Sequence, residues 1–355
     1  MGKNAQSNQM IQVNSEQAKR VMEKMILNRR NFMLVGAPGV GKTCLVEEAA
    51  RTTERKLIVF HPVISDPTDF KGMPAIVKNE DPENETAFLA QFVPFDSLKR
   101  LLTATEPTIA FADDLGQAPP MVQAAWMQLV LARKLDDRIV SKHITFISAS
   151  NRKEDKAGVS GILEPLKSRF HAILELVVDH DIWLTWARSK EAHIHPYVRA
   201  FIRWRGAPML YSFTASNDMT NSPNPRTVEH VSNIVWDGHD EDVRPMVIAG
   251  AAGSAFSIEF ESFIKIVKNL PKMSAIVDKP KTCPVPDDNQ VSAQYAIIEA
   301  MLDQANKKII KAFLTYITRF KPEFQQWFTT QLKEFKPECV NTEAFTTWAS
   351  KFGIK

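Results

Sequence analysis

Cysteine is scarce in this sequence, and the three that occur, Cys44, Cys283 and Cys339, lie far apart and beside no pair of histidines. We therefore expect neither a disulfide framework nor a zinc site. The polar N-terminus lacks the apolar core of a signal peptide, and no run approaches the roughly 18 to 20 apolar residues that a membrane span requires. These absences predict a protein of the reducing cytoplasm with no membrane partner.

The sequence also lacks a large excess of one charge, because it contains 44 Lys and Arg residues and 41 Asp and Glu residues. Overall charge therefore gives no reason to expect nucleic acid or an anionic membrane as partner, and such a role would need a local basic patch. What is abundant is apolar side chain: 44% of 355 residues are hydrophobic, enough for a buried core in a chain of two or three domains.

Five short apolar runs alternate with segments of helical periodicity in the first half of the chain. The runs cover residues 31–36, 56–60, 108–112, 143–150 and 172–178. Runs of this length and spacing predict an α/β fold, with a five-stranded parallel sheet covered by helices on both faces and ligands bound at the carboxyl ends of the strands. We assign this α/β core to residues 1–178.

The interval between the second and third runs, about 61–105, is too long for one helix and its loops. It contains HPVISDPTDFKGMP, the charged segment NEDPENE and AFLAQFVPFDSLKRLL, which predict a loop, a small hairpin and a helix. An insertion of this size usually has a function, although a tolerated surface excursion is the alternative.

Aromatic-rich helical patterns replace the strand pattern after Asp179. They predict a helical domain over 179–270, a proline-rich linker over 271–290 and a helical extension over 291–355. The bulky aromatic side chains of the extension are expected in its core. The extension could dock a partner, brace an assembly or only enlarge the helical domain.

The segment GAPGVGKT, residues 36–43, matches the phosphate-binding pattern G-x-x-x-x-G-K-T between a predicted strand and a predicted helix. Backbone amides and the helix N-terminus favour phosphate there, Lys42 would reach the β- and γ-phosphates, and Thr43 would hold Mg²⁺. A chance glycine-rich turn is the alternative. The residues expected to contact the nucleotide are Gly36, Ala37, Pro38, Gly39, Val40, Gly41, Lys42, Thr43 and Cys44, the last as a buried helix residue.

An acidic pair follows the third apolar run, in IAFADDLGQ. Asp113 is the expected second metal-side residue, and Asp114 would orient or activate the attacking water. Aspartate is one methylene shorter than glutamate, so slow turnover is expected; alternatively, Asp114 only caps the helix that begins near Ala118. Asn151, at the end of the fourth run, could hold the water from the opposite side, although asparagine is also a common turn residue.

Five segments in this order resemble the AAA+ ATPases of the MoxR-type branch, over Met1 to roughly Asn289. They are GAPGVGKT, DPTDFKG, IAFADDLGQAPPMVQAAWMQLVL, ISASNRKEDKAGVSGILEPLKSRF and PNPRTVEHVS. The resemblance implies a P-loop AAA+ core followed by an α-helical lid, with ATP and Mg²⁺ bound between core and lid and between subunits of a homo-oligomeric ring, usually a hexamer. It also implies that the insertion faces the working surface of the ring. The sequence departs from the family at Asp114, where most members have glutamate.

The same resemblance implies three further roles at the nucleotide. Asn151 would be the sensor of the fourth strand, Arg226 the sensor of the lid, and Arg169 the arginine finger that reaches the γ-phosphate of a neighbouring subunit. Competing candidates for the finger are Arg152, Arg133 and Arg138. A surface ion pair for Arg169 and a helix-terminal salt bridge for Arg226 are the simpler alternatives.

The function that the resemblance implies is ATP hydrolysis coupled to the remodelling or assembly of a protein partner. Such ATPases often act with a protein bearing a von Willebrand factor A domain, which would be encoded elsewhere. A motor or loader acting on DNA or RNA is the alternative, and it would need a basic lining or an added module. A third hypothesis is a ring that uses nucleotide mainly as a structural ligand because Asp114 is too short for catalysis.

Overall fold

The computed structural model describes residues 10–79, 88–135, 137–155, 158, 161–189, 191–215 and 218–352. The chain divides into two compact units. One contains residues up to 178 together with 214–217, and the other contains 179–213 and the residues from 218 onward. We call them the α/β unit and the helical unit.

A six-stranded parallel sheet with the order β1-β10-β2-β9-β6-β3 forms the centre of the α/β unit. Its strands are β1 (Gln12–Val13), β2 (Phe32–Val35), β3 (Lys56–Phe60), β6 (Thr108–Ala112), β9 (Ile144–Ser150) and β10 (Ala172–Leu176). The five predicted strands are confirmed. The predicted number is wrong by one, because the two-residue strand β1 pairs with β10 but is too short to show any periodicity.

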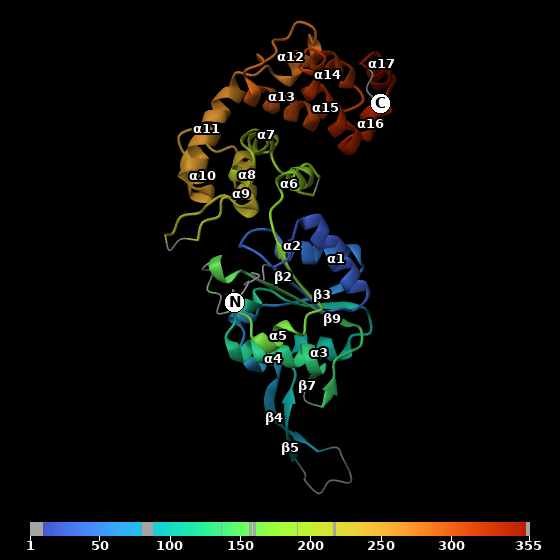
Figure 1. Cartoon of the computed structure of the whole chain (residues 1–355), viewed down its shortest axis with the longest axis vertical. Coiled ribbons are helices and arrows are strands. Elements are labelled where there is room, and N and C mark those ends of the chain that lie inside the picture. The colour runs from blue at the N-terminus through green and yellow to red at the C-terminus, as the bar shows by residue number, and fades with distance from the viewer. Residues whose placement is uncertain are drawn as a thin grey trace, which may run out of the picture. The chain divides into compact units, whose positions relative to one another are not determined.

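Helices cover both faces of this sheet, as the α/β pattern predicted (Figure 1). The helices α1 (Ser15–Leu27) and α2 (Lys42–Thr52) bury apolar side chains in one cluster. On the other face, α3 (Asp96–Thr103), α4 (Pro120–Ala132) and α5 (Glu164–Lys167) contribute to a second cluster. The central strands β2, β6 and β9 are buried along their whole length, which explains why they read as continuous apolar runs.

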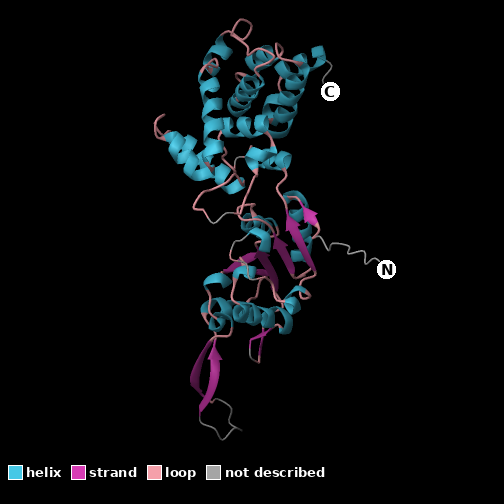
Figure 2. Ribbon diagram, turned by 60° about the vertical axis from the view of Figure 1, so that its left-hand side comes forward, coloured by secondary structure: helices cyan, strands magenta, loops and turns pink. Residues whose placement is uncertain are grey.

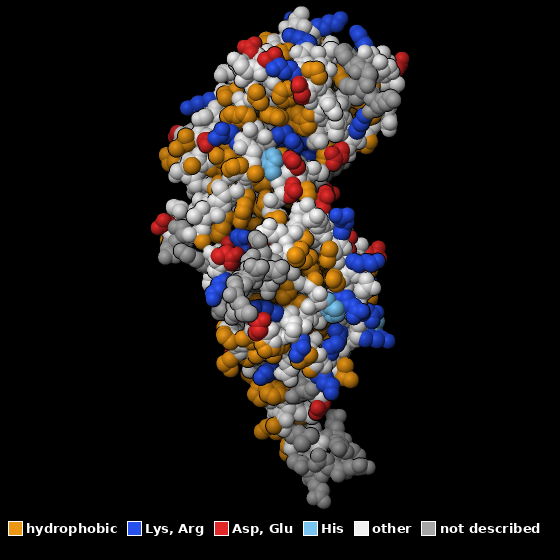
Figure 3. All heavy atoms as spheres, viewed as in Figure 1, with side chains coloured by type: hydrophobic (Ala, Val, Ile, Leu, Met, Phe, Trp, Pro, Cys, Tyr) orange, Lys and Arg blue, Asp and Glu red, His pale blue; other side chains and the backbone are white. Residues whose placement is uncertain are grey.

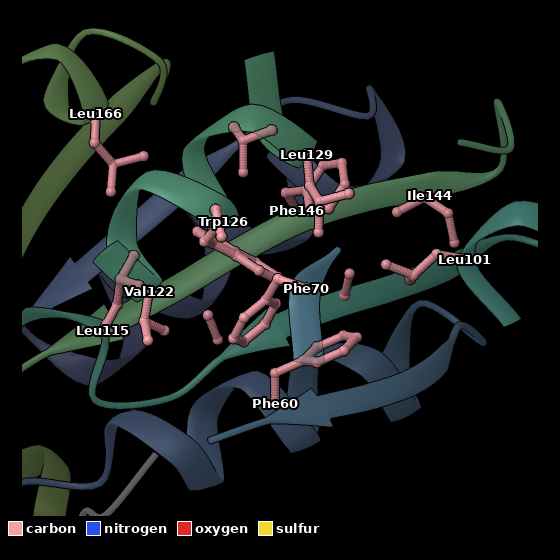
Figure 4. Close-up of a cluster of buried hydrophobic side chains, with 14 of the residues drawn as sticks. Phe60, Phe70, Leu101, Leu115, Val122, Trp126, Leu129, Ile144, Phe146 and Leu166 are labelled. Atoms are coloured by element: carbon pink, nitrogen blue, oxygen red, sulfur yellow. The ribbon is translucent and has the colours of Figure 1, made fainter. Parts of the chain in front are cut away.

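Four aromatic rings form the centre of the second cluster (Figure 4). The Trp126 ring lies with its centroid 5.4 Å from those of Phe60 and Phe146 and 5.7 Å from that of Phe70. The indole Nε1 donates a hydrogen bond of 3.2 Å to the Ser148 hydroxyl. Because Phe70 belongs to the DPTDFKG segment, this packing fixes the base of the insertion to the sheet.

The insertion continues from this base as two short 3-10 turns, η1 (Pro62–Ile64) and η2 (Pro67–Phe70), and an antiparallel hairpin of β4 (Met73–Lys78) and β5 (Phe88–Val93). Gly72 begins the hairpin with φ 93°, and a Cβ there would lie 2.6 Å from the Val93 carbonyl oxygen. The loop, hairpin and helix predicted for this interval are therefore present, and residues 80–87 lie outside the described ranges. A second small hairpin pairs β7 (Lys134–Leu135) with β8 (Arg138–Ile139).

The helical unit consists of helices and loops throughout its described residues (Figure 2). None of the helices described in the chain is long and apolar enough to span a bilayer. The helices of the helical unit are α6 (His180–Trp186), α7 (Pro196–Arg205), α8 (Ala207–Leu210), α9 (Pro225–Asp237), α10 (Arg244–Ala252), α11 (Ser254–Lys268), α12 (Met273–Asp278), α13 (Val291–Gln304), α14 (Ile310–Ile317), α15 (Pro322–Phe335), α16 (Pro337–Val340) and α17 (Glu343–Phe352).

The segment 271–290, predicted to be a proline-rich linker, is part of this folded unit. Ile276 in α12 is fully buried, and Cys283 joins the same apolar cluster as α13, α14 and α15. The Tyr316 hydroxyl donates a 2.6 Å hydrogen bond to the Pro284 carbonyl oxygen. The prediction failed because proline content reports local stiffness and says nothing of the side chains that tertiary packing buries.

The C-terminal helices also pack against the helices before the proline-rich segment, since α13 lies against α7. Arg199 on α7 donates a 3.1 Å hydrogen bond to Glu299 on α13, and both side chains are buried. Of the aromatic residues expected in the core of the extension, Phe313, Tyr316, Phe320 and Phe328 are buried, and Phe324 and Trp327 pack against them.

Candidate functional site

The loop of residues 36–41 connects β2 to α2, and glycine is required at three of its positions for different reasons. A Cβ at Gly36 would lie 2.8 Å from the Leu176 carbonyl oxygen, so close packing excludes a side chain there. Gly39 and Gly41 have φ values of 76° and 98°, in the left-handed region that other residues rarely adopt. The loop thus leads directly into the N-terminus of α2, whose amides and partial positive charge favour phosphate.

Lys42, the first residue of α2, is buried inside this loop with 6% of its surface exposed. Its Nζ donates hydrogen bonds of 2.9 Å and 3.0 Å to the carbonyl oxygens of Gly36 and Ala37, and one of 2.6 Å to Oδ1 of Asn151. Three acceptors match the three donors of an ammonium group, which makes its burial tolerable. The cation is therefore held in the loop, within contact of the Asn151 side chain at the end of β9.

Thr43 and Asp113 bring two oxygen donors together across the sheet. The Thr43 hydroxyl donates a 2.7 Å hydrogen bond to Oδ2 of Asp113, which directly follows β6. The other carboxylate oxygen of Asp113 accepts a 3.1 Å hydrogen bond from the Asp114 amide. Hydroxyl and carboxylate oxygens are the ligands that Mg²⁺ prefers, so this pair has the chemistry to hold that ion.

Asp114 and Asn151 meet at the carboxyl ends of β6 and β9. The Asn151 amide nitrogen donates hydrogen bonds of 3.1 Å to Oδ1 of Asp114 and 3.0 Å to Oε1 of Gln117. Asp114 precedes the turn η3 (Leu115–Gln117) with φ 54°, and its side chain makes no capping hydrogen bond there. The helix that begins after Ala118 is α4, whose N-cap residue is Pro119 without a side-chain cap, so the alternative role of Asp114 as its cap is not observed.

Gln117 is a polar member of this group that the sequence interpretation missed. The one available signal was its place in the loop that follows the acidic pair, since polar side chains after a strand end gather at the same edge of a parallel sheet. Cys44 corrects another expectation, because it is exposed. The apolar face of α2 that packs on the sheet consists instead of Val46, Ala49 and Ala50.

Three of the four candidate finger arginines are engaged within the chain. Arg152 pairs with Asp155 at 2.7 Å and with Glu175 at 2.9 Å. Arg133 donates hydrogen bonds of 2.9 Å to the carbonyl oxygens of Ser141 and Ile144. Arg138 donates to the Phe92 carbonyl oxygen. These guanidinium groups hold loops and strands of their own subunit.

Arg169 differs from these three arginines. It follows α5 and is half-buried, and its side chain has no ion pair or hydrogen bond with any residue that the structure describes. Its Nε is shielded from solvent without a partner. An uncommitted guanidinium suits a group that would act on a ligand or on another subunit, and the simpler alternative of an ion pair is not observed.

Arg226 lies in the helical unit and is therefore not among the side chains that the α/β unit brings together. It is exposed in the first turn of α9, where Asn224 and Thr227 form a reciprocal capping box. Within the described ranges Arg226 forms no ion pair, so the expected alternative of a helix-terminal salt bridge is absent there.

Comparison with known proteins gives a family match for this part of the chain. Residues 31–170, which contain every site residue of the α/β unit, match the family model described as the AAA domain of the dynein-related subfamily. No curated protein sequence matches the chain.

Two similar solved structures illustrate how distant such relatives are. RuvB from Thermotoga maritima, described as a Holliday junction branch migration motor, is 16% identical over 86% of each chain with a TM-score of 0.38. NtrX from Brucella abortus in complex with ATP is 12% identical over 93% of this chain and 69% of that chain, with a TM-score of 0.41. At these TM-scores neither similarity bears on function.

Proposed function

Because residues 31–170 match the AAA domain model and carry a P-loop, we propose that the chain is a MoxR-type AAA+ ATPase that assembles into a homo-oligomeric ring, hexameric by the family pattern, and remodels or assembles a protein partner. The observation that carries the proposal is the linked set of Lys42, Asn151 and Asp114 beside the pair of Thr43 and Asp113. Helices of 179–270 would act as the lid over the nucleotide, carrying Arg226, and 291–352 would extend it.

In this proposal each side chain of the α/β unit has one task toward ATP. The loop amides and Lys42 bind the phosphates, and Lys42 exchanges its carbonyl partners for phosphate oxygens. Thr43 and Asp113 are the residues that would hold Mg²⁺, whose charge offsets that of the β- and γ-phosphates when it is bound.

Hydrolysis then depends on the acidic residue and the amide opposite it. Asp114 accepts a proton as the water oxygen attacks the γ-phosphorus and the bond to ADP breaks. Asn151 holds the carboxylate in place through its 3.1 Å hydrogen bond and would donate to the attacking water by giving up its 3.0 Å hydrogen bond to Gln117. Both groups must lie within hydrogen-bond reach of the same water, and the carboxyl ends of β6 and β9 are neighbours in the sheet.

Arg169 is the residue we assign to the γ-phosphate of a neighbouring subunit. Its guanidinium is uncommitted among the described residues, whereas Arg133, Arg138 and Arg152 stabilise their own subunit. A planar guanidinium matches the charge spread over the transferring phosphoryl group. Activity would therefore depend on assembly.

The hairpin of β4 and β5 favours a protein client over nucleic acid. Its exposed side chains include Met73 and Val93 on one face and Ile76 and Phe88 on the other, so both faces carry apolar side chains (Figure 3). By sequence, the segment that joins the strands carries Glu80, Asp81, Glu83 and Glu85 and no basic residue. Apolar surface suits a protein and clustered acids repel phosphate, so a client protein or a von Willebrand factor A domain partner is the better candidate.

The test is to purify wild type and the Lys42→Ala and Asp114→Asn variants, and to measure phosphate release, the assembly state with an ATP analogue, and the proteins that Asp114→Asn retains. We expect ATPase activity only in wild type, a ring with the analogue, and a client that raises the wild-type rate. Ile76→Asp should abolish stimulation by the client and keep the basal rate, with Met246→Asp on α10 as the matched control. Recovery of nucleic acid alone, with a rate that DNA or RNA stimulates, would favour a nucleic-acid motor or loader.

A further inference from the structure

The helical unit contains a cavity of 470 Å³ whose lining includes none of the residues assigned to ATP. It is lined by the segment between α6 and α7 and by α7, α9, α13 and the end of α15. Its charged and aromatic lining consists of Arg188, His193, Arg199, Trp236, Asp303 and Lys336. A cavity of this size fits a small molecule, because ligand pockets commonly measure about 300 to 1,000 Å³.

Two buried arginines share one buried carboxylate beside this cavity. The side chains of Arg188 and Arg199 are 6% and 5% exposed, and both pair with Glu299, which is fully buried. Arg199 also donates to the Ile194 carbonyl oxygen at 2.5 Å and to Asp303 at 3.2 Å, so each of its three nitrogens has an acceptor. Arg188 differs, because its Nε and Nη1 are buried without a hydrogen-bond partner.

Further basic side chains add to this imbalance. Arg203 lies 5.0 Å above the Trp327 ring, the same ring that Arg188 approaches to 5.9 Å. Lys336 reaches the Asp303 carbonyl oxygen at 3.4 Å. Two buried cations, Arg188 and Arg199, thus share one fully buried carboxylate, and a buried cluster with surplus positive charge is costly unless an anion joins it. Arg203 and Lys336 are partly buried, and the Asp303 side chain is 42% exposed.

Burial, with a smaller effect of neighbouring arginine charges, disfavours positive charge on two groups of this region. Burial, and after it the charge of Arg199, lowers the pKa of His195 to about 4. Burial also lowers the pKa of Arg188, with Arg199 and Arg203 acting in the same direction against the opposing effect of Glu299. Both shifts show that further positive charge is disfavoured in this region.

His193 at the cavity is held in an unusual backbone conformation. Its φ of 50° is left-handed, its carbonyl oxygen accepts a 3.0 Å hydrogen bond from the Trp236 indole, and the two rings stack at 5.0 Å. A non-glycine residue in this region of φ is rare and is concentrated at binding and catalytic sites. The cavity therefore has a fixed aromatic wall beside its basic side chains.

We propose that this cavity binds a small organic anion through a phosphate or carboxylate group, with Arg188 and Lys336 as its direct partners and Arg199 supplying additional positive charge. The bound anion would join the helices before the proline-rich segment to α13 and α15. The site is independent of the P-loop, and its existence does not rest on the proposed ATPase function.

The experiment uses the full chain with Lys42→Ala in every preparation, so that binding at the P-loop is suppressed. Inorganic pyrophosphate and citrate are titrated by calorimetry at low ionic strength, as phosphate and carboxylate probes. We expect one saturable site; the probe that binds more tightly identifies the recognised group. Lys336→Ala should weaken binding by roughly fivefold to tenfold because it removes a nearby charge.

Two further variants separate ligand binding from a structural role. Asp303→Asn keeps an oxygen for Arg199 but removes a competing negative charge, so it should strengthen binding by roughly threefold or more, which loss of structure would not do. Lys311→Ala on α14 is the control, with the same change of charge outside the cavity lining, and should leave affinity within about twofold. The proposal is overturned if neither probe saturates, if Lys336→Ala and Lys311→Ala act alike, or if Asp303→Asn fails to tighten binding.

Discussion

The Asn151 side chain accepts a 2.6 Å hydrogen bond from the ammonium group of Lys42. The same amide donates to Asp114 at 3.1 Å, so the phosphate-binding cation and the proposed general base are joined through one side chain. A phosphate that draws Lys42 away therefore changes the contacts of Asn151, and through Asn151 those of Asp114. In the proposed mechanism, phosphate binding and the positioning of the attacking water would therefore be coupled.

Replacing Asn151 tests this coupling. Asn151→Asp would place a carboxylate against Lys42 and a second negative charge beside Asp114, so we expect ATP affinity to fall about tenfold or more, since hydrogen bonds between charged groups are the strong ones. Asn151→Ala removes the partner of Lys42 and should keep ATP affinity within a few-fold while hydrolysis is lost. Titration with a fluorescent ATP analogue checks both, and equal affinities of the two variants would contradict the coupling.

Asp114 can be tested with a matched pair of substitutions. Asp114→Asn keeps the shape that tolerates φ 54° and removes the charge, so we expect hydrolysis to fall by about 10²-fold to 10⁴-fold with ATP affinity nearly unchanged. Asp114→Glu restores a longer carboxylate but fits the left-handed backbone less well, and it should cost about 1 kcal/mol of unfolding free energy. Phosphate release and urea unfolding measure the two effects; a glutamate variant as stable as wild type would exclude the backbone explanation.

Long apolar strands and the motifs at their ends were predictable from the sequence, because β2, β6 and β9 are buried throughout and the P-loop, Asp113 and Asn151 follow such strands. The strand β1 was not predictable from the sequence, since a strand of two residues shows no periodicity of apolar side chains. The packing of Ile276 and Cys283 was hidden by the prolines around them. The contact of Gln117 with Asn151, and whether each arginine is paired within the chain, depend on side-chain contacts between distant segments. Composition and spacing do not encode such contacts.

Mixing inactive subunits tests whether Arg169 acts on a neighbour. Arg169→Ala and Asp114→Asn should each lower hydrolysis by about 10²-fold or more. In a mixed ring, a site with intact Asp114 would meet the intact Arg169 of an Asp114→Asn subunit, so partial activity should return. Phosphate release measured across mixing ratios shows this. Activity that stays absent at every ratio, with mixed assembly verified by mass, would show that Arg169 acts within its own subunit or not at all.

Because Phe70 anchors the insertion, its replacement should lower the free energy of unfolding much more than replacement of the exposed Phe88. Phe70 is 1% exposed among Trp126 and Phe60, so Phe70→Ala should cost about 3 to 5 kcal/mol of unfolding free energy. Phe88 on the hairpin is 63% exposed, and Phe88→Ala should change stability by less than about 0.5 kcal/mol. The relevant step in urea unfolding is the one that ADP shifts, because that step reports the α/β unit.

The lowered pKa of His195 predicts how the stability of the helical unit depends on pH. Burial and the nearby charge of Arg199, with a smaller contribution from His193 and against that of Asp303, lower its pKa from 6.5 to about 4. The unfolded chain therefore binds a proton between these values while the folded chain does not, so stability is lost as pH falls through this range. The loss between pH 7.5 and pH 5 is about 2 kcal/mol for this group.

A single substitution isolates this contribution. His195 caps α7 by accepting a 3.1 Å hydrogen bond from the Tyr197 amide at Nδ1. His195→Asn keeps a good capping acceptor and does not titrate, so its unfolding free energy should fall less than that of wild type between pH 7.5 and pH 5. Urea unfolding at the two pH values gives the difference directly. Equal losses in both proteins would mean that the acid sensitivity of this unit arises from other groups, because only the imidazole has been removed.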